Sequence, residues 1–411
     1  MTLPAPGKLG PSPPHDPHRV LHLIHGEHWS GGEQSLYLLL KYLDRRRYDP
    51  TVICLSGGLL RDRLEHMGIK TELVPMSGKW DLSVVLPIRR IIDRLAPHLV
   101  ITQTPRTNLL GRLATRGRKV PIFTIVQAPI SRDTNAATPA PMNARIERWT
   151  SRWTQRYVGV SQAVAEDLVD LGVSRDRIGV IYNSFDPAIL EQAPYPPVLR
   201  QELGLDAGHP LIGMLASFRP RKGAETLIDA MPLITEAVPS AILALVGHGN
   251  WVDGEDYLAC LRRRAKDRGV EDRVLTLGFR EDVPQVLSSL SVKVLPSLFG
   301  EGSSLVLMEA MALGVPVVAS DTEGNNEVVQ DEKSGLLFCV RDSSALARAV
   351  IRILTQGHLA ERLATAGRDR AREHFAADHM AHAYVHEYDN LLGPADVPEP
   401  SASSARERRP Q

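Results

Sequence analysis

The chain has 411 residues, which is too long for one compact core and suits two domains of roughly 150–200 residues each. Hydrophobic residues make up 43% of it and charged residues 23%, which excludes general disorder, and the aromatic content of 5% argues against a nucleic-acid binder built on stacking platforms. The formal net charge is zero, but residues 1–190 hold 25 Lys and Arg against 17 Asp and Glu. A basic first half indicates an anionic partner, and a chance difference between the two surfaces is the alternative.

The three cysteines, Cys54, Cys260 and Cys339, lie far apart and form no C-x-x-C pair. This spacing excludes a disulfide framework and a zinc site of the usual kind, and it fits a reducing cytoplasm. No apolar run reaches the ~18–20 residues that span a bilayer, and the Pro-rich start lacks the apolar core of a signal peptide. We therefore expect a cytoplasmic protein.

The first half of the chain alternates between strand and helix patterns. Residues 1–18 contain six prolines and predict a disordered tail. An apolar strand at 20–24 is followed by Gly31 and Gly32 and by a helical pattern from Glu33, which is how a doubly wound sheet begins. The alternation continues with strands at 51–55, 71–74, 98–102, 122–126, 157–160 and 178–182, and with helices at 59–67, 86–95, 108–115, 143–156 and 163–171.

A Pro- and Gly-rich segment at 188–208 predicts a linker, after which the alternation starts again. Two such runs predict an α/β fold of two Rossmann-like, doubly wound domains that face each other across a cleft. We place the first domain at 19–187, the second at 209–375, a C-terminal helix at 376–392 and a disordered tail at 393–411. The second run comprises strands at 211–215, 241–246 and 274–277, helices at 224–234 and 257–268, further elements at 283–290, 292–295, 305–313, 315–319, 328–331 and 336–338, and helical segments at 344–355 and 360–388.

Ligands of open α/β sheets bind beyond the carboxyl ends of the strands, so the turns of the second domain are candidate sites. One turn places Arg219, Arg221 and Lys222 beside a helix N-terminus, where backbone N–H groups already favour anions. Such cations can stabilise a diphosphate, including the charge that develops as it leaves. A solvated basic loop is the alternative. The lone G-x-G at Gly247–Gly249 is weaker evidence, because glycines at a turn usually satisfy backbone geometry only.

Another turn of the second domain is acidic and glycine-rich and carries Glu301. The helix that follows it carries Glu309 about two turns after its start. The helix N-terminus at 303–305 offers another anion site. Because the helix is largely apolar, Glu309 needs hydrogen-bond donors if it is buried, and sugar or ribose hydroxyls would supply them. An exposed helical glutamate is the commoner alternative.

Taken in order, these motifs resemble the family-4 group of retaining glycosyltransferases with the GT-B fold. The resemblance covers about residues 20–390. It is most specific in E-G-x-x-L-V-L-M-E-A-M-A-L-G-V-P-V-V-A-S-D, whose E-x7-E spacing joins Glu301 to Glu309. It also includes R-P-R-K-G from Arg219, V-S-Q-A-V followed by V-I-Y-N-S-F-D, and G-N-N-E-V-V followed by S-G-L-L-F.

The resemblance implies a role for each matching residue. Arg219 and Lys222 would hold the donor diphosphate and stabilise it as leaving group, Glu301 would contact the transferred sugar, and Glu309 would bind the ribose. The segment with Phe279 and Arg280 would lie along the base, and the C-terminal helix would cross back to the first domain. The remaining donor-binding positions are Gly31 and Gly32 in the N-terminal loop and Gly302, Ser303, Ser304 and Leu305 in the acidic turn.

The function implied is retaining transfer of a hexose from a nucleotide diphosphate sugar to a glycan or lipid-linked acceptor, in cell-surface polysaccharide or glycolipid synthesis. No Asp-x-Asp occurs in the chain, so we expect no metal and no cofactor, and no motif indicates nucleic acid. The alternatives are a catalytically silent partner subunit with this fold, and a GT-B enzyme of another type such as a nucleotide-sugar epimerase.

Several positions depart from the family pattern. Ser217 stands where many relatives have an arginine, and Arg219 is expected to substitute for it. Gln103 and Gln127 stand where relatives often have histidine, and glutamine cannot act as a general base. The acceptor-side candidates are therefore His25, His28 and Gln127, although a lone histidine is more often structural.

The segment 143–156 is basic and amphipathic. It combines Trp149 and Trp153 with four arginines, a pattern typical of helices that lie on anionic membrane surfaces. Burial of its apolar side against the first domain is the alternative. We therefore expect a cytoplasmic enzyme that also associates with the inner face of the membrane and acts on a lipid-linked acceptor.

Overall fold

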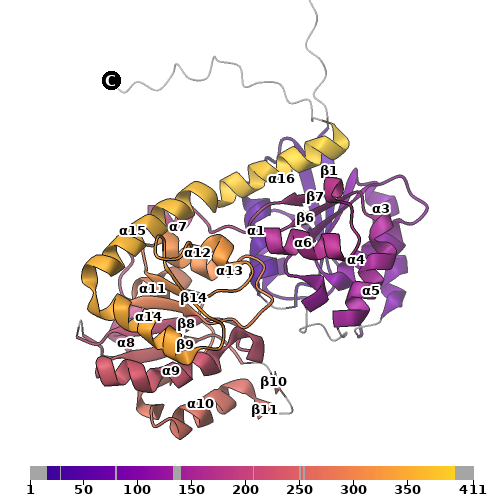
Figure 1. Cartoon of the computed structure of the whole chain (residues 1–411). Helices are drawn as coiled ribbons and strands as arrows, with labels where there is room; N and C mark the ends of the chain where they lie inside the picture. Colours follow the sequence, from indigo (N-terminus) through magenta and orange to yellow (C-terminus); the bar gives the residue numbers. More distant parts are fainter. Residues whose placement is uncertain are drawn as a thin grey trace, which may run out of the picture.

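The computed structural model describes residues 16–393, apart from 28, 79–80, 133–139, 207, 250 and 253–254. The chain forms two α/β domains, each built around one parallel sheet, as predicted (Figure 1). Most of the two predicted tails lies outside the described residues. Residue His18, however, already belongs to the first strand, so the predicted tail at 1–18 is too long at its end.

The first sheet has seven strands in the order β3-β2-β1-β4-β5-β6-β7, and all neighbouring pairs are parallel. Parallel neighbours require crossover connections, which the helices supply. Its elements are β1 (His18–Ile24), α1 (Gly31–Tyr42), β2 (Tyr48–Cys54), α2 (Leu59–His66), β3 (Lys70–Leu73), α3 (Val85–Leu95), β4 (Leu99–Thr102), α4 (Pro105–Thr115), β5 (Ile122–Val126), α5 (Ala140–Thr150), β6 (Arg156–Gly159), α6 (Gln162–Asp170) and β7 (Ile178–Val180).

Both faces of this sheet are covered. Along β1, Val20 and Ile24 join the core that α1, α6 and the C-terminal helix complete, whereas Leu21 and Leu23 join the core beneath α3 and α4. A strand that is buried on both faces carries a continuous apolar run, which is why β1, β4 and β5 could be recognised in the sequence.

The second sheet has six parallel strands in the order β12-β9-β8-β13-β14-β15. A short antiparallel pair, β10 (Trp251–Val252) with β11 (Glu255–Asp256), lies outside it and was not predicted. The other elements are α7 (Ala188–Glu191), α8 (Val198–Glu202), β8 (Leu211–Leu215), α9 (Ala224–Ala237), β9 (Ile242–Val246), α10 (Tyr257–Asp267), β12 (Val274–Thr276), α11 (Val283–Ser288), β13 (Val292–Leu295), α12 (Leu305–Ala312), β14 (Val317–Ser320), α13 (Asn325–Val328), β15 (Leu336–Phe338), α14 (Ser343–Thr355), α15 (Gly357–His374) and α16 (Ala377–Leu392).

The chain crosses between the domains at two adjacent points. Phe185 donates its backbone N–H to the carbonyl of Phe375 at 2.9 Å, and its own carbonyl accepts from Ala377 at 3.1 Å. This pairing interrupts the helical segment predicted over 360–388 where the C-terminal helix was predicted to begin, because Ala376 is extended (φ −78°, ψ 141°) beside Phe185. The segment 188–208, predicted as a linker, contains the short helices α7 and α8.

Helix α16 is fixed to the first domain by apolar and charged contacts, and Figure 1 shows α15 and α16 following one another along both domains. Tyr388 packs edge-on against Tyr48 and Phe123, with ring centroids 5.5 and 5.2 Å apart. Arg156 of β6 forms a two-pronged ion pair with Glu387 at 2.7 and 2.8 Å. The last helix is therefore part of the first domain's core although it follows the second domain in sequence.

The structure has a shorter helix than the one predicted over 143–156, and the buried face of this helix is polar. Helix α5 ends at Thr150, a 3₁₀ turn follows over Ser151–Trp153, and Arg156 already lies in β6. Its inward Glu147 accepts from the fully buried Arg112 at 2.5 Å. Arg112 also donates to three hydroxyl groups, those of Thr150, Thr154 and Tyr157 at 2.6–2.9 Å.

Replacing Arg112 by leucine should lower the free energy of unfolding by about 3–5 kcal/mol, because the carboxylate of Glu147 is then buried without its cation. Arg175→Ala is the matched control, since the Arg175–Glu166 pair is exposed and contributes at most about 1 kcal/mol. Chemical denaturation measures both. Equal effects of the two substitutions would contradict the importance of this buried pair.

Candidate functional site

A cavity of about 540 Å³ lies between the two domains, at the carboxyl ends of both sheets. The first domain contributes the ends of β1 and β5 and the start of α1, and the second domain contributes the ends of β8, β9 and β13 and the start of α12. The cavity is thus where the two doubly wound sheets would each bind a ligand.

The basic turn of the second domain lies in the cavity wall. Arg219, Arg221 and Lys222 all line it, on the 3₁₀ turn (Pro220–Lys222) between β8 and α9. Gly223 ends this turn with φ +68°, and a Cβ there would come within 2.0 Å of the carbonyl oxygen of Pro296. Only glycine allows the turn to pack so closely against the segment that leads to Glu301.

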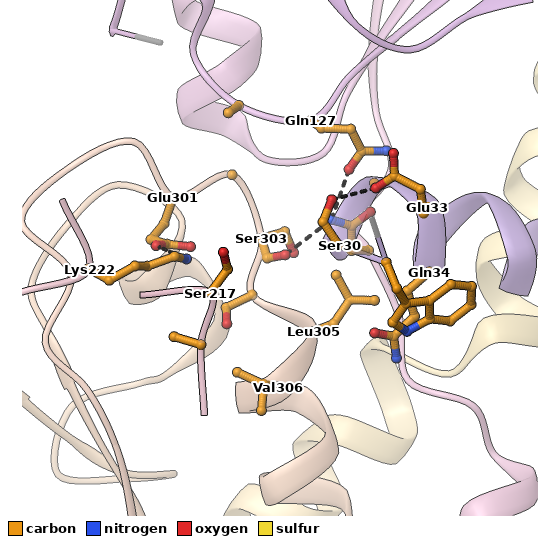
Figure 2. Close-up of a pocket in the computed structure, with 18 of the residues that line it drawn as sticks. Ser30, Glu33, Gln34, Gln127, Ser217, Lys222, Glu301, Ser303, Leu305 and Val306 are labelled. Atoms are coloured by element: carbon orange, nitrogen blue, oxygen red, sulfur yellow. Dashed lines mark hydrogen bonds and ion pairs between the residues drawn. The ribbon is translucent and has the colours of Figure 1, made fainter. Parts of the chain in front are cut away.

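Glu301 is the partner of this basic turn. Its Oε1 accepts from Lys222 Nζ at 2.6 Å and from the Ser297 hydroxyl at 2.7 Å, with Arg221 at 3.4 Å (Figure 2). Burial alone would raise the pKa of Glu301, but the charges of Lys222 and Arg221 outweigh it and lower the pKa to about 2. Glu301 is therefore a carboxylate at any physiological pH.

Glu309, on α12, has the opposite environment. Its partner is an amide from the other domain, since Gln34 of α1 donates to Glu309 Oε1 at 2.6 Å. Burial raises the pKa of Glu309 to about 7, and neither the hydrogen bond from Gln34 nor the charge of Lys293 reverses this. Glu309, which is partly exposed, thus has an amide rather than a cation as its hydrogen-bond partner, and this partner, Gln34, was not predicted.

Lys293 of β13 was also not predicted as part of the site. It is fully buried, and its Nζ donates to the carbonyl of Val294 at 2.7 Å. Burial, together with the charge of Lys222, lowers the pKa of Lys293 to about 7. This lysine interacts electrostatically with both Glu301 and Glu309, so it lies within range of the two carboxylates.

The loop at 302–305 touches the first domain. A Cβ on Gly302 would lie 2.1 Å from the carbonyl oxygen of Gln127, so this close approach requires glycine. Asn183 donates both to Gln127 Oε1 at 3.2 Å and to the carbonyl of Ser303 at 3.1 Å. On the facing side, a Cβ on Gly31 would lie 3.5 Å from Leu305, and one on Gly32 would lie 3.8 Å from Gln127. Ser304 also lines the cavity and precedes the first turn of α12.

The two residues predicted to lie along the nucleotide base differ in how far their side chains are occupied by contacts within the protein. Phe279 lines the cavity, is 47% exposed, and lies with its ring centroid 6.2 Å from that of His248. Arg280 also lines the cavity, but its guanidinium forms ion pairs with Glu202 at 2.6 Å and Asp282 at 2.7 Å. Its charge is therefore compensated by neighbours.

On the acceptor side, Gln127 lines the cavity and His25 does not. His25 lies 3.6 Å from Glu27, and His28 lies outside the described residues. Among the described residues no cluster of His, Cys, Asp or Glu could hold a metal ion, and no helix is long and apolar enough to cross a membrane. Further residues of this wall were not predicted as site residues, namely Ser30, Glu33, Arg63, Gln103, Thr104 and Asn108.

Comparison with known proteins identifies the two halves. Residues 29–189 match the family model Glycosyltransferase Family 4, and residues 197–370 match Glycosyl transferases group 1. The chain is 26% identical over 334 residues to the UDP-Gal:alpha-D-GlcNAc-diphosphoundecaprenol alpha-1,3-galactosyltransferase of Escherichia coli, covering 79% of this chain and 84% of that protein. It is 34% identical over 175 residues to the phosphatidyl-myo-inositol mannosyltransferase of Mycobacterium leprae, covering 41% of this chain and 44% of that protein.

Among solved structures, HepE of Anabaena in complex with UDP-glucose superposes with a TM-score of 0.81 and 25% sequence identity. The match covers 90% of this chain and 99% of that one. The two-domain arrangement is therefore the GT-B fold.

The two carboxylates should affect stability with opposite dependence on pH. The pKa of Glu309 is raised from 4.5 to about 7 in the folded protein, so ionising this side chain destabilises the fold. The stability that its protonated form contributes is fully present below pH 4.5 and is lost as the pH rises to about 7. The effect of Glu309→Gln on the free energy of unfolding should therefore be more stabilising at pH 8 than at pH 4.5, by roughly 2–3 kcal/mol. Denaturant unfolding of both proteins at the two pH values measures this.

Glu301→Gln is the control of opposite sign. The pKa of Glu301 is lowered, so the stability it contributes is present above pH 4.5 and lost as the pH falls towards 2. The substitution should destabilise the protein at neutral pH, where Lys222 loses its counter-charge. A Glu309→Gln effect that does not change with pH would contradict the environment described for Glu309.

Proposed function

The chain belongs to the group 1 glycosyltransferases with the GT-B fold, and on this basis we propose that it transfers a hexose from a nucleotide diphosphate sugar, with retention, to a glycan or lipid-linked acceptor. One observation supports this most directly: the basic turn and both carboxylates of the E-x7-E motif line one cavity. The cations suit the diphosphate, and the carboxylates suit the hydroxyl groups of the sugar and the ribose.

The mechanism follows from where charge develops. As the bond between the anomeric carbon and the diphosphate breaks, the sugar gains oxocarbenium character and the diphosphate gains negative charge. Arg219 and Lys222, fixed in the turn beside α9, would stabilise that negative charge without reorganising, which is the largest contribution in many such sites. Glu301, which is ionised, would accept from the hydroxyl groups of the transferred sugar.

Glu309 would accept from the ribose hydroxyls. Its present donor is the amide of Gln34, so the ribose would either replace this amide or share the carboxylate with it. The raised pKa of Glu309 fits this role, because a carboxyl group with too few donors binds hydroxyl groups well once it is ionised.

Retention without a metal is part of the proposal. The attacking hydroxyl would approach on the face that the diphosphate leaves, and a leaving phosphate oxygen would take its proton. This route needs no protein base, which fits the presence of Gln103 and Gln127 in the cavity, because glutamine cannot act as a base. The cations of the basic turn would take the charge-stabilising role that a metal has in other transferases.

The acceptor is proposed to be held at the cytoplasmic face of a membrane, in polysaccharide or glycolipid synthesis. Support comes from an exposed surface at the end of α5. Trp149 is 57% exposed and packs edge-on against Trp153 at 5.3 Å, and Arg152 lies 4.9 and 5.2 Å from the two rings. Arg145 and Arg148 are exposed on the same helix. Exposed tryptophan among arginines suits an anionic interface.

The donor site is tested by thermal-shift titration with UDP, GDP and ADP, with and without magnesium. We expect one nucleotide to stabilise the protein without metal, by about 2.7 kcal/mol at 100 times its Kd. Lys222→Ala should lose this gain, because the diphosphate then lacks its closest fixed amine. Arg175→Ala, on an exposed pair outside the cavity, should keep it.

If none of the three nucleotides stabilises the wild type at millimolar concentration, the donor assignment is wrong and a silent partner subunit becomes the better description. Stabilisation that requires magnesium would overturn the metal-free mechanism. An inverted anomeric centre in the product, read by NMR, would overturn retention.

The membrane surface is tested by co-sedimentation with vesicles of phosphatidylcholine containing phosphatidylglycerol. Trp149→Ala with Arg152→Ser should weaken binding at least about 5-fold, since one basic side chain near an anionic surface contributes about 1 kcal/mol. Leu86→Ala with Arg90→Ser is the control, because both residues are exposed on α3 of the same domain. Equal binding by the two double variants would contradict the assignment of this surface.

A further inference from the structure

Two amide side chains in the first domain's wall of the cavity have polar atoms that no residue in the described part of the chain satisfies. Gln103 follows β4 directly and is 3% exposed, and neither its Oε1 nor its Nε2 has a hydrogen-bond partner. Asn108, one turn into α4, is 1% exposed, and its Oδ1 also has no partner. Both residues line the cavity. Buried amide atoms are normally paired, so three unpaired ones at the same cavity, two on Gln103 and one on Asn108, indicate a ligand.

The local backbone explains why these side chains remain available. The N–H groups of Gln103 and Thr104 are both satisfied by the hydroxyl of Thr107, at 3.2 and 2.9 Å. Asn108 has only a long hydrogen bond, from Nδ2 to Glu147 at 3.4 Å, and Glu147 is already paired with Arg112. Other contacts therefore hold helix α4 in place, and the carboxamide of Gln103 takes part in none of them.

The remaining wall of the first domain carries almost no uncompensated charge. Its charged residues, within the described part of the chain, are Glu33 and Arg63. The hydroxyl of Ser30 donates to Glu33, and Arg63 pairs with Glu281 at 2.9 Å and lies 4.0 Å from the ring of Trp29. The rest of the wall next to the amides is apolar or neutral and includes Ile125, Val126, Ala128 and Ile130. The opposite wall holds the cations Arg219, Arg221 and Lys222.

The geometry points to a subsite for a neutral sugar ring, formed by Gln103 and Asn108, that binds the terminal residue of the acceptor. A carboxamide offers one donor and one acceptor side by side, so Gln103 can receive a hydrogen bond from one sugar hydroxyl and donate to its neighbour. Asn108 Oδ1 accepts from a further hydroxyl. The apolar side chains contact the C–H face of the ring, and among the described residues that line this wall the one cation, Arg63, is already paired with Glu281.

This inference rests on the proposed function and specifies its acceptor. A hydroxyl oxygen of the bound ring forms the new bond to the anomeric carbon of the donor hexose. The bond from that carbon to the diphosphate oxygen breaks, its electron pair stays with the nucleoside diphosphate, and the hydroxyl proton passes to the diphosphate. Gln103 and Asn108 bind the ring that carries the attacking hydroxyl and take no proton themselves.

The thermal-shift titration selects the nucleotide, and the experiment then measures transfer from the glucose, galactose and mannose conjugates of that nucleotide. The acceptors are octyl glucoside, galactoside, mannoside and N-acetylglucosaminide. We expect transfer to at least one of these neutral acceptors. Gln103→Leu should lower kcat/KM for it about 10-fold or more, because a site built to hydrogen-bond hydroxyl groups discriminates strongly once a partner is removed. Asn108→Leu should act in the same direction. Gln201→Leu, an exposed position on α8, is the matched control.

Two further measurements separate binding from structure. Gln103→Leu should not lower the melting temperature, since it removes buried polar atoms that have no partner. Monodeoxy derivatives of the preferred octyl glycoside should identify one hydroxyl whose loss costs the wild type about 10-fold. Removing that hydroxyl should not lower kcat/KM of Gln103→Leu any further, because the amide that binds it is already absent.

Failure of this inference can be distinguished from failure of the proposed function. If no nucleotide stabilises the wild type, the proposed function fails first. If nucleotides bind but Gln103→Leu uses octyl glycosides as well as the wild type does, the sugar subsite is wrong. It is equally wrong if the wild type glycosylates phosphatidylinositol but neither glycosylates nor is stabilised by any octyl glycoside in the presence of the nucleotide.

Discussion

The ion pair between Lys222 and Glu301 is the interaction on which the site depends. It joins two segments that are 79 residues apart in sequence, at 2.6 Å and almost out of contact with solvent. Charges buried to this extent are costly unless they are paired and hydrogen-bonded. The two turns must therefore stay together, and the glycine at 223 lets them do so by allowing the turn to lie against Pro296. The pair holds a cation and a carboxylate in the cavity before any ligand arrives.

The E-x7-E motif places two identical side chains in environments that separate their chemistry. Glu301 has cationic neighbours and a pKa of about 2, whereas Glu309 has an amide neighbour and a pKa of about 7. Residue type and spacing were visible in the sequence, but this difference was not. It arises because Lys222 comes from the turn after β8, and Gln34 comes from the other domain. Both partners are brought in by the fold rather than by nearby sequence.

The sequence predicted the fold, and it named more of the residues by which the second domain lines the cavity than of those by which the first domain does. Periodic apolar runs identified both parallel sheets, because strands covered on both faces carry such runs. It placed the start of the C-terminal helix at 376, but it could not predict the contact that interrupts the chain there, which is made by the backbone of Phe185, nearly 200 residues earlier. Nor could it predict that the inner face of α5 would be polar, since Glu147 is stabilised by Arg112 from α4. Gln103 was noted only as a glutamine in a position that often holds histidine; its unsatisfied amide became visible once its surroundings were known.

The division of charge in the cavity follows from its being built by two sheets. Each domain offers the carboxyl ends of its own strands, so each can present a different chemistry to the same space. The second domain supplies cations beside a helix N-terminus. The first supplies amides, hydroxyl groups and apolar side chains, with two charged residues, Glu33 and Arg63, of which Arg63 is paired with Glu281. Contacts between the domains, such as Asn183 with Ser303 and Gln34 of α1 with Glu309 of α12, join the two walls across the cavity.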